Sequence, residues 1–170
     1  VGKPDLSTTV FGKKIDMPLF LSPTAMQRPY HHDGDKASAR AAEKFGTFYS
    51  MSTMANNTIE EIAEISKGPK LFQLYVHKDQ SITDDLIERC RTSGYDGMCL
   101  TVDTLVAGNR ERDHRTGFTT PPKLTIQSLM SFAMRPEWVF NYFTHKKFEL
   151  SNVAKKTDKG TNIAKSVIEY

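Results

Sequence analysis

Short apolar runs alternate with helical patterns along the first two thirds of the chain. The runs are mostly apolar rather than alternating, which is typical of strands buried on both faces of a parallel sheet. Ahead of them, residues 8–15 with the pair Gly12-Lys13 predict a hairpin. The runs that predict parallel strands are 18–22, 47–51, 71–76 and 98–102.

Helical patterns separate these runs. The first, at about 35–44, is rich in alanine and is expected to end at Gly46. The second opens with a capping box at 58–61, and the third begins near Ser81 and ends at Gly94. Strand, helix and strand in this order predict right-handed βαβ units. Such units form either an open doubly wound sheet or a closed barrel.

The apolar spacing within two of these helices predicts which side chains face the sheet. In the first helix the expected face consists of Ala37, Ala41, Ala42 and Phe45. In the third helix it consists of Ile82, Leu86, Ile87 and Cys90.

The strand and helix rhythm stops after residue 103. We therefore interpret residues 1–170 as one incomplete domain in which 104–170 form a long insertion after the fourth strand. Its middle, 124–148, concentrates apolar and aromatic side chains among a few basic ones. Two interpretations stay open for this segment: an amphipathic stretch at a bilayer interface, or ordinary packing over the barrel or against another subunit.

Composition excludes several classes of function. The net charge is +3, and because Lys and Arg are interleaved with Asp and Glu, we expect no nucleic-acid partner. The two cysteines are too few for a disulfide framework or a thiolate metal site. The adjacent residues His31, His32 and Asp33 are expected to be exposed on a loop without converging on a metal, and the other histidines look isolated.

Polar side chains cluster at the carboxyl ends of the predicted strands, where ligands bind in parallel α/β folds. Amide and hydroxyl groups at these ends suit the polar edge of a heterocycle. A phenol and a guanidinium suit a carboxylate. The candidates, from the second strand onward, are Ser52, Gln73, Tyr75, Thr101, Asp103 and Arg110.

Four sequence blocks then indicate a family. They are SPTAMQ at 22–27, LFQLYV at 71–76, LTVD at 100–103 and GNRERD at 108–113, and in this order they resemble the FMN-dependent α-hydroxy-acid oxidizing enzymes. The stretch from 116 to 150 is most similar to the bacterial, respiratory type of L-lactate dehydrogenase. The resemblance implies a (β/α)8 TIM barrel. This chain would hold its N-terminal part, about four β/α units plus the insertion.

The resemblance also implies roles for single residues. Tyr75 and Arg110 match substrate-binding positions, and Met54 matches a position that senses the substrate side chain. Asp103 matches the acid that orients a catalytic histidine, which is expected on a later strand and is absent from this chain. The positions that match FMN contacts are Pro23, Thr24, Ala25, Ser52, Gln73 and Thr101.

The implied reaction is the oxidation of L-lactate to pyruvate, with two electrons passing to FMN and then to a quinone or cytochrome. Without the histidine, we expect the chain alone to be inactive. The complete protein is expected to be a homo-oligomer, peripheral to the cytoplasmic side of the inner membrane. Two alternatives stay open: an oxygen-using oxidase of the glycolate or lactate type, and a non-catalytic half-barrel that binds a flavin or a partner.

Overall fold

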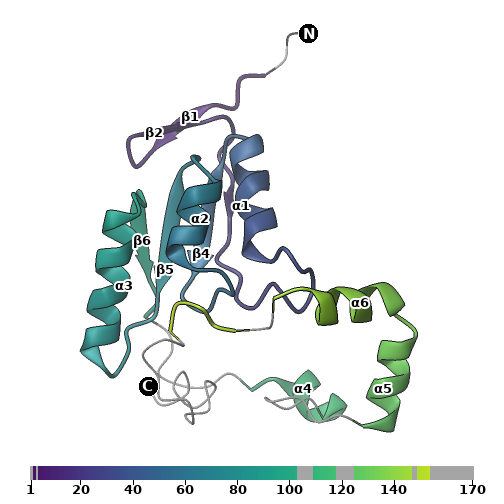
Figure 1. Cartoon of the computed structure of the whole chain (residues 1–170). Coiled ribbons are helices and arrows are strands. Elements are labelled where there is room, and N and C mark those ends of the chain that lie inside the picture. Colours follow the sequence, from purple (N-terminus) through teal and green to yellow (C-terminus); the bar gives the residue numbers. More distant parts are fainter. Residues whose placement is uncertain (1, 3, 103–108, 118–124, 147–148, 154–170) are drawn as a thin grey trace.

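A four-stranded parallel sheet forms the centre of the computed structural model, which describes residues 2, 4–102, 109–117, 125–146 and 149–153. The strands lie in the order β3-β4-β5-β6, which confirms the predicted parallel sheet. Helices α1 (Asp35–Lys44), α2 (Ile59–Ile65) and α3 (Gln80–Thr92) connect them and cover one face (Figure 1). The strands are β3 (Phe20–Leu21), β4 (Phe48–Ser52), β5 (Lys70–Leu74) and β6 (Gly97–Leu100).

The predicted hairpin is present as β1 (Thr8–Val10) and β2 (Lys13–Ile15), but its turn lies one residue earlier than expected. Val10 pairs with Lys13, so Phe11 and Gly12 form the turn instead of Gly12 and Lys13. Both turn residues have positive φ, 50° and 72°. This is the type I′ geometry that matches the twist of two antiparallel strands, and it places a non-glycine residue in a rarely used conformation.

The hairpin closes one end of the inner face of the sheet. Ile15, Phe48 and Leu71 are buried together there, and Val10 packs against them. The ring of Phe48 also meets the edges of Phe11 and Phe20, with centroids 6.0 Å and 5.0 Å apart. The hairpin therefore supplies an apolar plug at the end of the strands opposite their carboxyl ends (Figure 1).

Alternation along the strands divides the side chains between two faces. On the outer face, Tyr49, Met51 and Phe72 belong to the core beneath the helices. On the inner face, the register aligns Phe20 with Phe48 and Ser52 with Gln73. The inner face is thus apolar at the hairpin end and polar at the carboxyl end.

The expected buried face of α1 is confirmed at Ala42 and is wrong at Ala41 and Phe45. Its buried residues are Asp35, Ala39 and Ala42, at the i, i+4 and i+7 spacing of one helical stripe. Ala41 lies one residue from that stripe and is exposed, and Phe45 leaves the helix as its C-cap and is 58% exposed. In α3 the expected face is confirmed at Ile82, Leu86 and Cys90, whereas Ile87 is exposed.

The insertion contributes α4 (Glu111–Thr116), α5 (Ile126–Ala133) and α6 (Pro136–Thr144) at the end of the molecule opposite the hairpin (Figure 1). None of the helices in the described ranges is long and apolar enough to cross a membrane. Residues 149–153 then return to the sheet. Leu150 and Val153 are buried in the main core, so the insertion leaves and rejoins the same body.

Candidate functional site

A chain of buried hydrogen bonds links the carboxyl ends of three neighbouring strands. Ser52 Oγ donates to Gln73 Oε1 at 3.1 Å, and Gln73 Nε2 donates to Thr101 Oγ1 at 2.6 Å. Ser52 and Gln73 are 2% and 5% exposed, and Thr101 is half-buried. The structure thus brings together three of the residues predicted to contact the cofactor. We call them the amide chain.

Thr53 fixes the position of Gln73 in the amide chain through hydrogen bonds to its backbone and its side chain. Its Oγ1 donates to the Gln73 carbonyl at 2.6 Å and accepts the Tyr75 N–H at 3.1 Å, while its own N–H donates to Gln73 Oε1 at 3.4 Å. The Gln73 amide oxygen therefore accepts two donors. Its nitrogen carries two hydrogens, and the bond to Thr101 uses one of them.

The loop between β3 and α1 carries the other predicted cofactor contacts, Pro23, Thr24 and Ala25. Pro23 and Thr24 are exposed, and Ala25 is half-buried. Gln27 Nε2 donates to the Thr24 carbonyl at 3.2 Å, and the Met26 N–H donates to the Met54 carbonyl at 3.2 Å. The second bond joins this loop to the end of β4.

Met26 holds an uncommon conformation in this loop, with φ at 52°. Positive φ in a residue with a side chain costs free energy and is tolerated where surrounding contacts impose it, often at binding sites. The bond from Met26 to Met54 is such a contact. This bond therefore holds the backbone of 23–25 in a defined position relative to the end of β4, the strand that carries Ser52.

The predicted substrate-binding residues are only partly placed. Tyr75 is half-buried and directly follows β5, the strand that carries Gln73. Arg110 is exposed at the N-cap of α4. Asp103 lies outside the described residues, so its support of a histidine stays a prediction.

Asp35, which sequence reasoning missed, shapes the loop after β4. Its carboxylate is fully buried and accepts the N–H groups of Asn56 at 2.9 Å and Asn57 at 3.2 Å. The Tyr49 hydroxyl donates to it at 3.4 Å. Burial raises the pKa of Asp35, and the backbone donors oppose that rise. The only local signal was an acidic residue in the first turn of α1.

Residues 149–153 close over this loop. Ser151 Oγ donates to the Asn56 carbonyl at 2.7 Å, and Asn152 Nδ2 donates to the Asn57 carbonyl at 3.1 Å. Asn152 Oδ1 accepts the N–H of Ile59 at 3.1 Å. The far end of the insertion therefore holds the start of α2.

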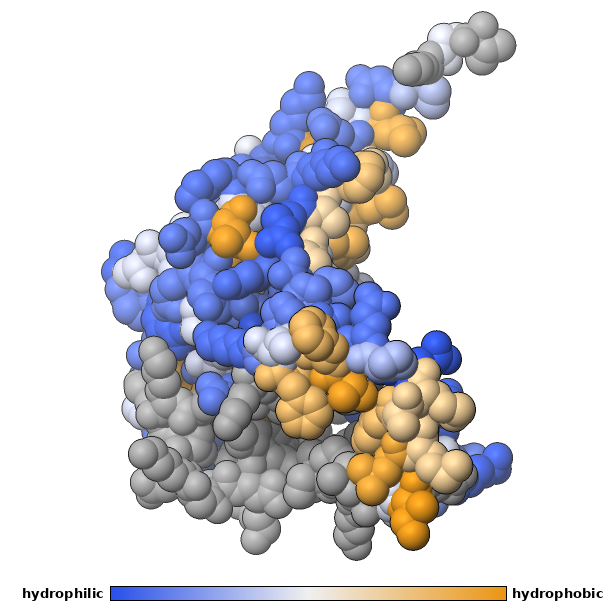
Figure 2. Space-filling model, turned by 45° about the vertical axis from the view of Figure 1, so that its right-hand side comes forward, coloured by the Kyte–Doolittle hydropathy of each residue, from blue (hydrophilic) through white to orange (hydrophobic). Residues whose placement is uncertain are grey.

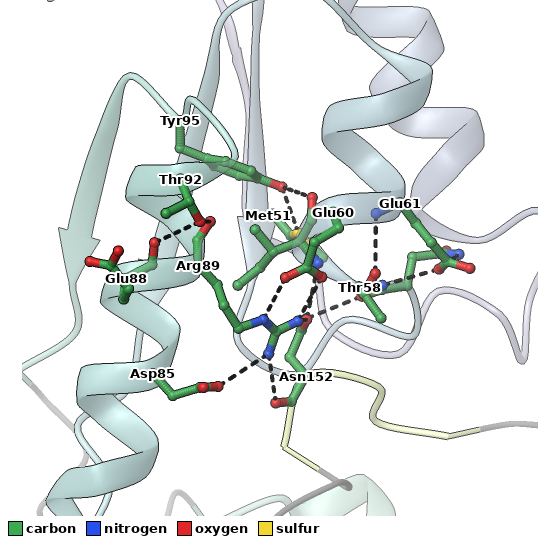
Figure 3. A network of polar contacts seen from close by, with 12 residues as sticks. Met51, Thr58, Glu60, Glu61, Asp85, Glu88, Arg89, Thr92, Tyr95 and Asn152 are labelled. Atoms are coloured by element: carbon green, nitrogen blue, oxygen red, sulfur yellow. Dashed lines mark hydrogen bonds and ion pairs between the residues drawn. The ribbon is translucent and has the colours of Figure 1, made fainter.

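Arg89 ties the same segment to two helices (Figure 3). From α3 it donates twice to the Glu60 carboxylate on α2, at 2.6 and 2.8 Å, and twice to Asn152, at 3.2 and 3.3 Å. The Arg89 guanidinium holds the pKa of Glu60 at about 2. Arg89 and its partners, 29 and 63 residues apart, form what we call the Arg89 clamp.

The histidines are less dispersed than the sequence suggested. His32 stacks on His31 with ring centroids 4.3 Å apart and meets His145 in a tilted arrangement at 4.2 Å, so the expectation that His145 is isolated is wrong. Potential ligand atoms of His31, His32 and Asp33 also lie within 4.8 Å of one another, contrary to the expected lack of convergence. However, Asp33 pairs with Arg40, and His31 Nδ1 accepts the Asp33 N–H at 3.2 Å.

The amide chain has the chemistry that a flavin ring requires. It offers buried amide and hydroxyl groups, without a charged side chain, at the carboxyl end of a parallel sheet. Such groups match the alternating donors and acceptors of an isoalloxazine edge. The residues present therefore fit FMN, and Gln73 lies at the centre of the amide chain.

Sequence comparisons relate the chain to known flavoenzymes. Residues 1–168 match a family model described as FMN-dependent dehydrogenase. Glycolate oxidase 1 of Zea mays is 44% identical over 128 residues, which cover 75% of this chain and 35% of the relative. An L-lactate oxidase of Nostoc sp. is 41% identical over 137 residues, covering 78% of this chain and 38% of the relative. The chain thus spans little more than a third of these relatives.

Solved structures give the same result. A structure described as the monotopic membrane protein (S)-mandelate dehydrogenase superposes with a TM-score of 0.85 and 28% identity, covering 98% of this chain and 46% of that protein. A lactate oxidase from Pediococcus acidilactici superposes with a TM-score of 0.67 and 32% identity, covering 79% and 37%. The parallel sheet is accordingly the N-terminal part of a TIM barrel, and the chain belongs to the FMN-dependent dehydrogenase family.

Proposed function

We propose that this chain supplies the flavin-binding portion of an enzyme that oxidizes a 2-hydroxy acid to a 2-oxo acid. The observation that carries the proposal is the amide chain, in which Ser52, Gln73 and Thr101 converge at the carboxyl ends of three strands. Bound FMN would accept the two electrons of the substrate. The residues of this chain would bind and orient the cofactor: Gln73 would hold the ring edge, and the backbone of 23–25 would contact the ring.

Recognition of the substrate carboxylate is assigned to Tyr75 and Arg110. A phenol donates one hydrogen bond and a guanidinium donates two in parallel, which together match a carboxylate. Asp103 is assigned the role of orienting a histidine base contributed by later sequence. Met54, which follows β4, is assigned the role of sensing the substrate side chain, because a flexible thioether can adapt to side chains of different shape.

We propose L-lactate as substrate and a quinone or cytochrome as electron acceptor. The similarity of the insertion to the respiratory type of lactate dehydrogenase supports this choice. A second candidate, an oxidase that passes electrons to oxygen, is supported by the names of relatives such as glycolate oxidase 1 and L-lactate oxidase.

We further propose that α5 and α6 lie against the cytoplasmic side of a membrane. Their apolar side chains are unusually exposed: Ile126 is 81%, Phe140 66% and Phe143 79% accessible. Figure 2 shows apolar side chains gathered at the end of the molecule that carries these helices. The similar (S)-mandelate dehydrogenase is itself described as a monotopic membrane protein, which supports the proposal.

Stopped-flow spectroscopy of the complete FMN-loaded protein, in which later sequence supplies the proposed histidine, tests the reaction. We expect L-lactate to bleach the flavin faster than glycolate or mandelate, and a soluble quinone to reoxidize it faster than oxygen. Faster reoxidation by oxygen would select the oxidase. A flavin that none of the three acids bleaches would contradict the proposed reaction.

The amide chain is tested separately by Gln73→Leu. Loss of the amide leaves the Ser52 and Thr101 hydroxyls without their partner and removes a flavin contact, so we expect FMN affinity to fall at least about tenfold. Gln80→Leu is the matched control, because Gln80 is exposed at the start of α3. Equal FMN retention in both variants would contradict the role of Gln73.

A further inference from the structure

We propose that a cavity between the β3–α1 loop and α6 binds the phosphate headgroup of an anionic phospholipid. The inference deepens the proposed membrane association and rests on it. The cavity, called the headgroup cavity below, has a volume of about 450 Å³. Cavities of this size accommodate small ligands.

Two segments far apart in the sequence form the walls. Residues 28–32 contribute one wall, and residues 134–146 contribute the other. Trp138 Nε1 donates to the Pro29 carbonyl at 2.7 Å, a contact between residues 109 positions apart. This bond fixes α6 against the loop, so the cavity is part of the fold and not a gap between independent segments.

The lining favours an anion. Three permanent cations, Arg28, Arg135 and Lys146, line the cavity together with one acid, Glu137. Lys146 Nζ also pairs with Glu61 Oε1 at 3.4 Å, so Arg28 and Arg135 are the main candidates to meet an anion. Arg and Lys donate charge-assisted hydrogen bonds to phosphate oxygens, and the planar guanidinium can donate two in parallel.

Imidazoles add further donors. His31, His32 and His145 line the same cavity, with the ring of His32 in contact with both of the others. His32 Nδ1 is buried and has no hydrogen-bond partner among the residues that the structure describes. A buried polar atom of this kind is stabilised by a ligand that satisfies it.

The two faces of α6 indicate a lipid as the source of the phosphate. Trp138, Asn141, Tyr142 and His145, spaced as one helical stripe, line the cavity. Phe140 and Phe143 are absent from that lining and are 66% and 79% exposed. The charged cavity and the apolar surface therefore meet along one helix. A phospholipid matches both, with its phosphate in the cavity and its acyl chains along α6.

The headgroup cavity does not include Ser52, Gln73 or Thr101. Lipid binding is therefore expected to leave FMN binding unchanged. A protein that binds no lipid could therefore still reduce its flavin, and a protein that does not oxidize the acid could still bind lipid.

Trp138 is the single tryptophan of the chain and lines the cavity, so its fluorescence reports occupancy. The FMN-loaded protein is titrated with monomeric dihexanoyl-phosphatidylglycerol, and Trp138→Phe gives the background. We expect a saturable change in Trp138 emission. Dihexanoyl-phosphatidylcholine and inorganic phosphate at the same concentrations are expected to cause little change.

The variant Arg135→Gln tests the role of charge within the cavity. We expect the apparent affinity for dihexanoyl-phosphatidylglycerol to fall about tenfold, since one charge-assisted contact is lost. Arg115→Gln is the matched control: it removes the same charge from α4, where Arg115 is exposed and pairs with Glu111. Both variants are first checked for unchanged flavin reduction by the substrate acid.

Several outcomes would overturn the inference. An equal response to inorganic phosphate would assign the cavity to a soluble anion. An equal response to phosphatidylcholine would show that the lipid charge is not recognised. A response that does not saturate, or equal losses in Arg135→Gln and Arg115→Gln, would reduce the effect to general electrostatic attraction.

Discussion

Asp35 illustrates how a single buried carboxylate can position a loop that it does not belong to. It lies in the first turn of α1 and accepts two backbone N–H groups from the loop after β4. That loop begins at Thr53, which fixes Gln73. Asp35 is therefore a positioning residue: it acts on the amide chain through the loop after β4, without contacting the chain itself.

Replacing Asp35 with alanine should be costly, because the N–H groups of Asn56 and Asn57 would be buried without an acceptor. We expect the free energy of unfolding to fall by about 2 kcal/mol or more, measured by urea denaturation. Asp35→Asn keeps an acceptor oxygen and should cost less. Asp84→Ala, at an exposed position on α3, serves as the control. If the alanine and asparagine variants lose equal stability, the acceptor role is wrong.

Among single residues, the sequence allowed prediction of those whose direction depends on strand periodicity. Ser52, Gln73 and Thr101 could be placed together because parallel strands end at one edge and side chains alternate. Asp35 could not, since its partners lie 21 and 22 residues away on another loop. Nothing in a local pattern encodes such a distance.

At the scale of elements, helix bounds were more predictable than helix orientation. The capping box at Thr58 and Glu61 is present as expected, and α1 covers the predicted residues. The α1 face was right only at Ala42, because alanine is tolerated on either side of a helix, whereas the buried stripe starts at Asp35. The return of residues 149–153 could not be predicted, because its contacts with Asn56 and Asn57 span 93 to 95 residues.

The Arg89 clamp joins α2, α3 and this returning segment, and it predicts a pH dependence. The pKa of Glu60 is about 2 in the folded protein and 4.5 without the fold, so the ionised carboxylate stabilises the native state. That stabilisation is complete above about pH 4.5 and is lost as the pH falls toward 2. Because the Glu60 side chain is 52% exposed, solvent screening limits its size.

The clamp is tested by thermal unfolding of Arg89→Met across this range. We expect the variant to be less stable than the parent near neutral pH and to lose less stability on acidification. Arg91→Met is the control, because Arg91 pairs with Glu88 on the exposed side of the same helix. If the stability of the parent and of Arg89→Met changes in parallel with pH, the clamp is not the origin of the pH dependence.

At the scale of the whole molecule, the two ends of the sheet differ in the chemistry of their side chains. The hairpin end is apolar and plugged, and the carboxyl end carries the amide chain and the insertion. Parts of the outermost strands are open: Phe20 of β3 is 44% exposed and Leu100 of β6 is 54% exposed. In a barrel these edges pair with further strands.

The apolar surface of α5 and α6 is expected to determine where the whole protein resides. Replacing Phe140 and Phe143 with serine should move most of the protein from the membrane fraction to the soluble fraction on cell fractionation, because less apolar area is buried in the interface. Phe45→Ser, at an exposed phenylalanine after α1, controls for general loss of apolar surface. An unchanged membrane fraction in the double variant would refute the assignment.

The anchoring of residues 149–153 at the β4–α2 loop has an evolutionary consequence. A segment whose two ends are fixed to the same rigid body can change length at little entropic cost, about 0.6 kcal/mol for each doubling. The part of the excursion between β6 and Leu150 that carries α5 and α6 can therefore be exchanged, whereas Arg110, near its start, belongs to the proposed substrate site. Shortening or replacing α5 and α6 is expected to change the proposed membrane association and to leave Ser52, Gln73 and Thr101 in place.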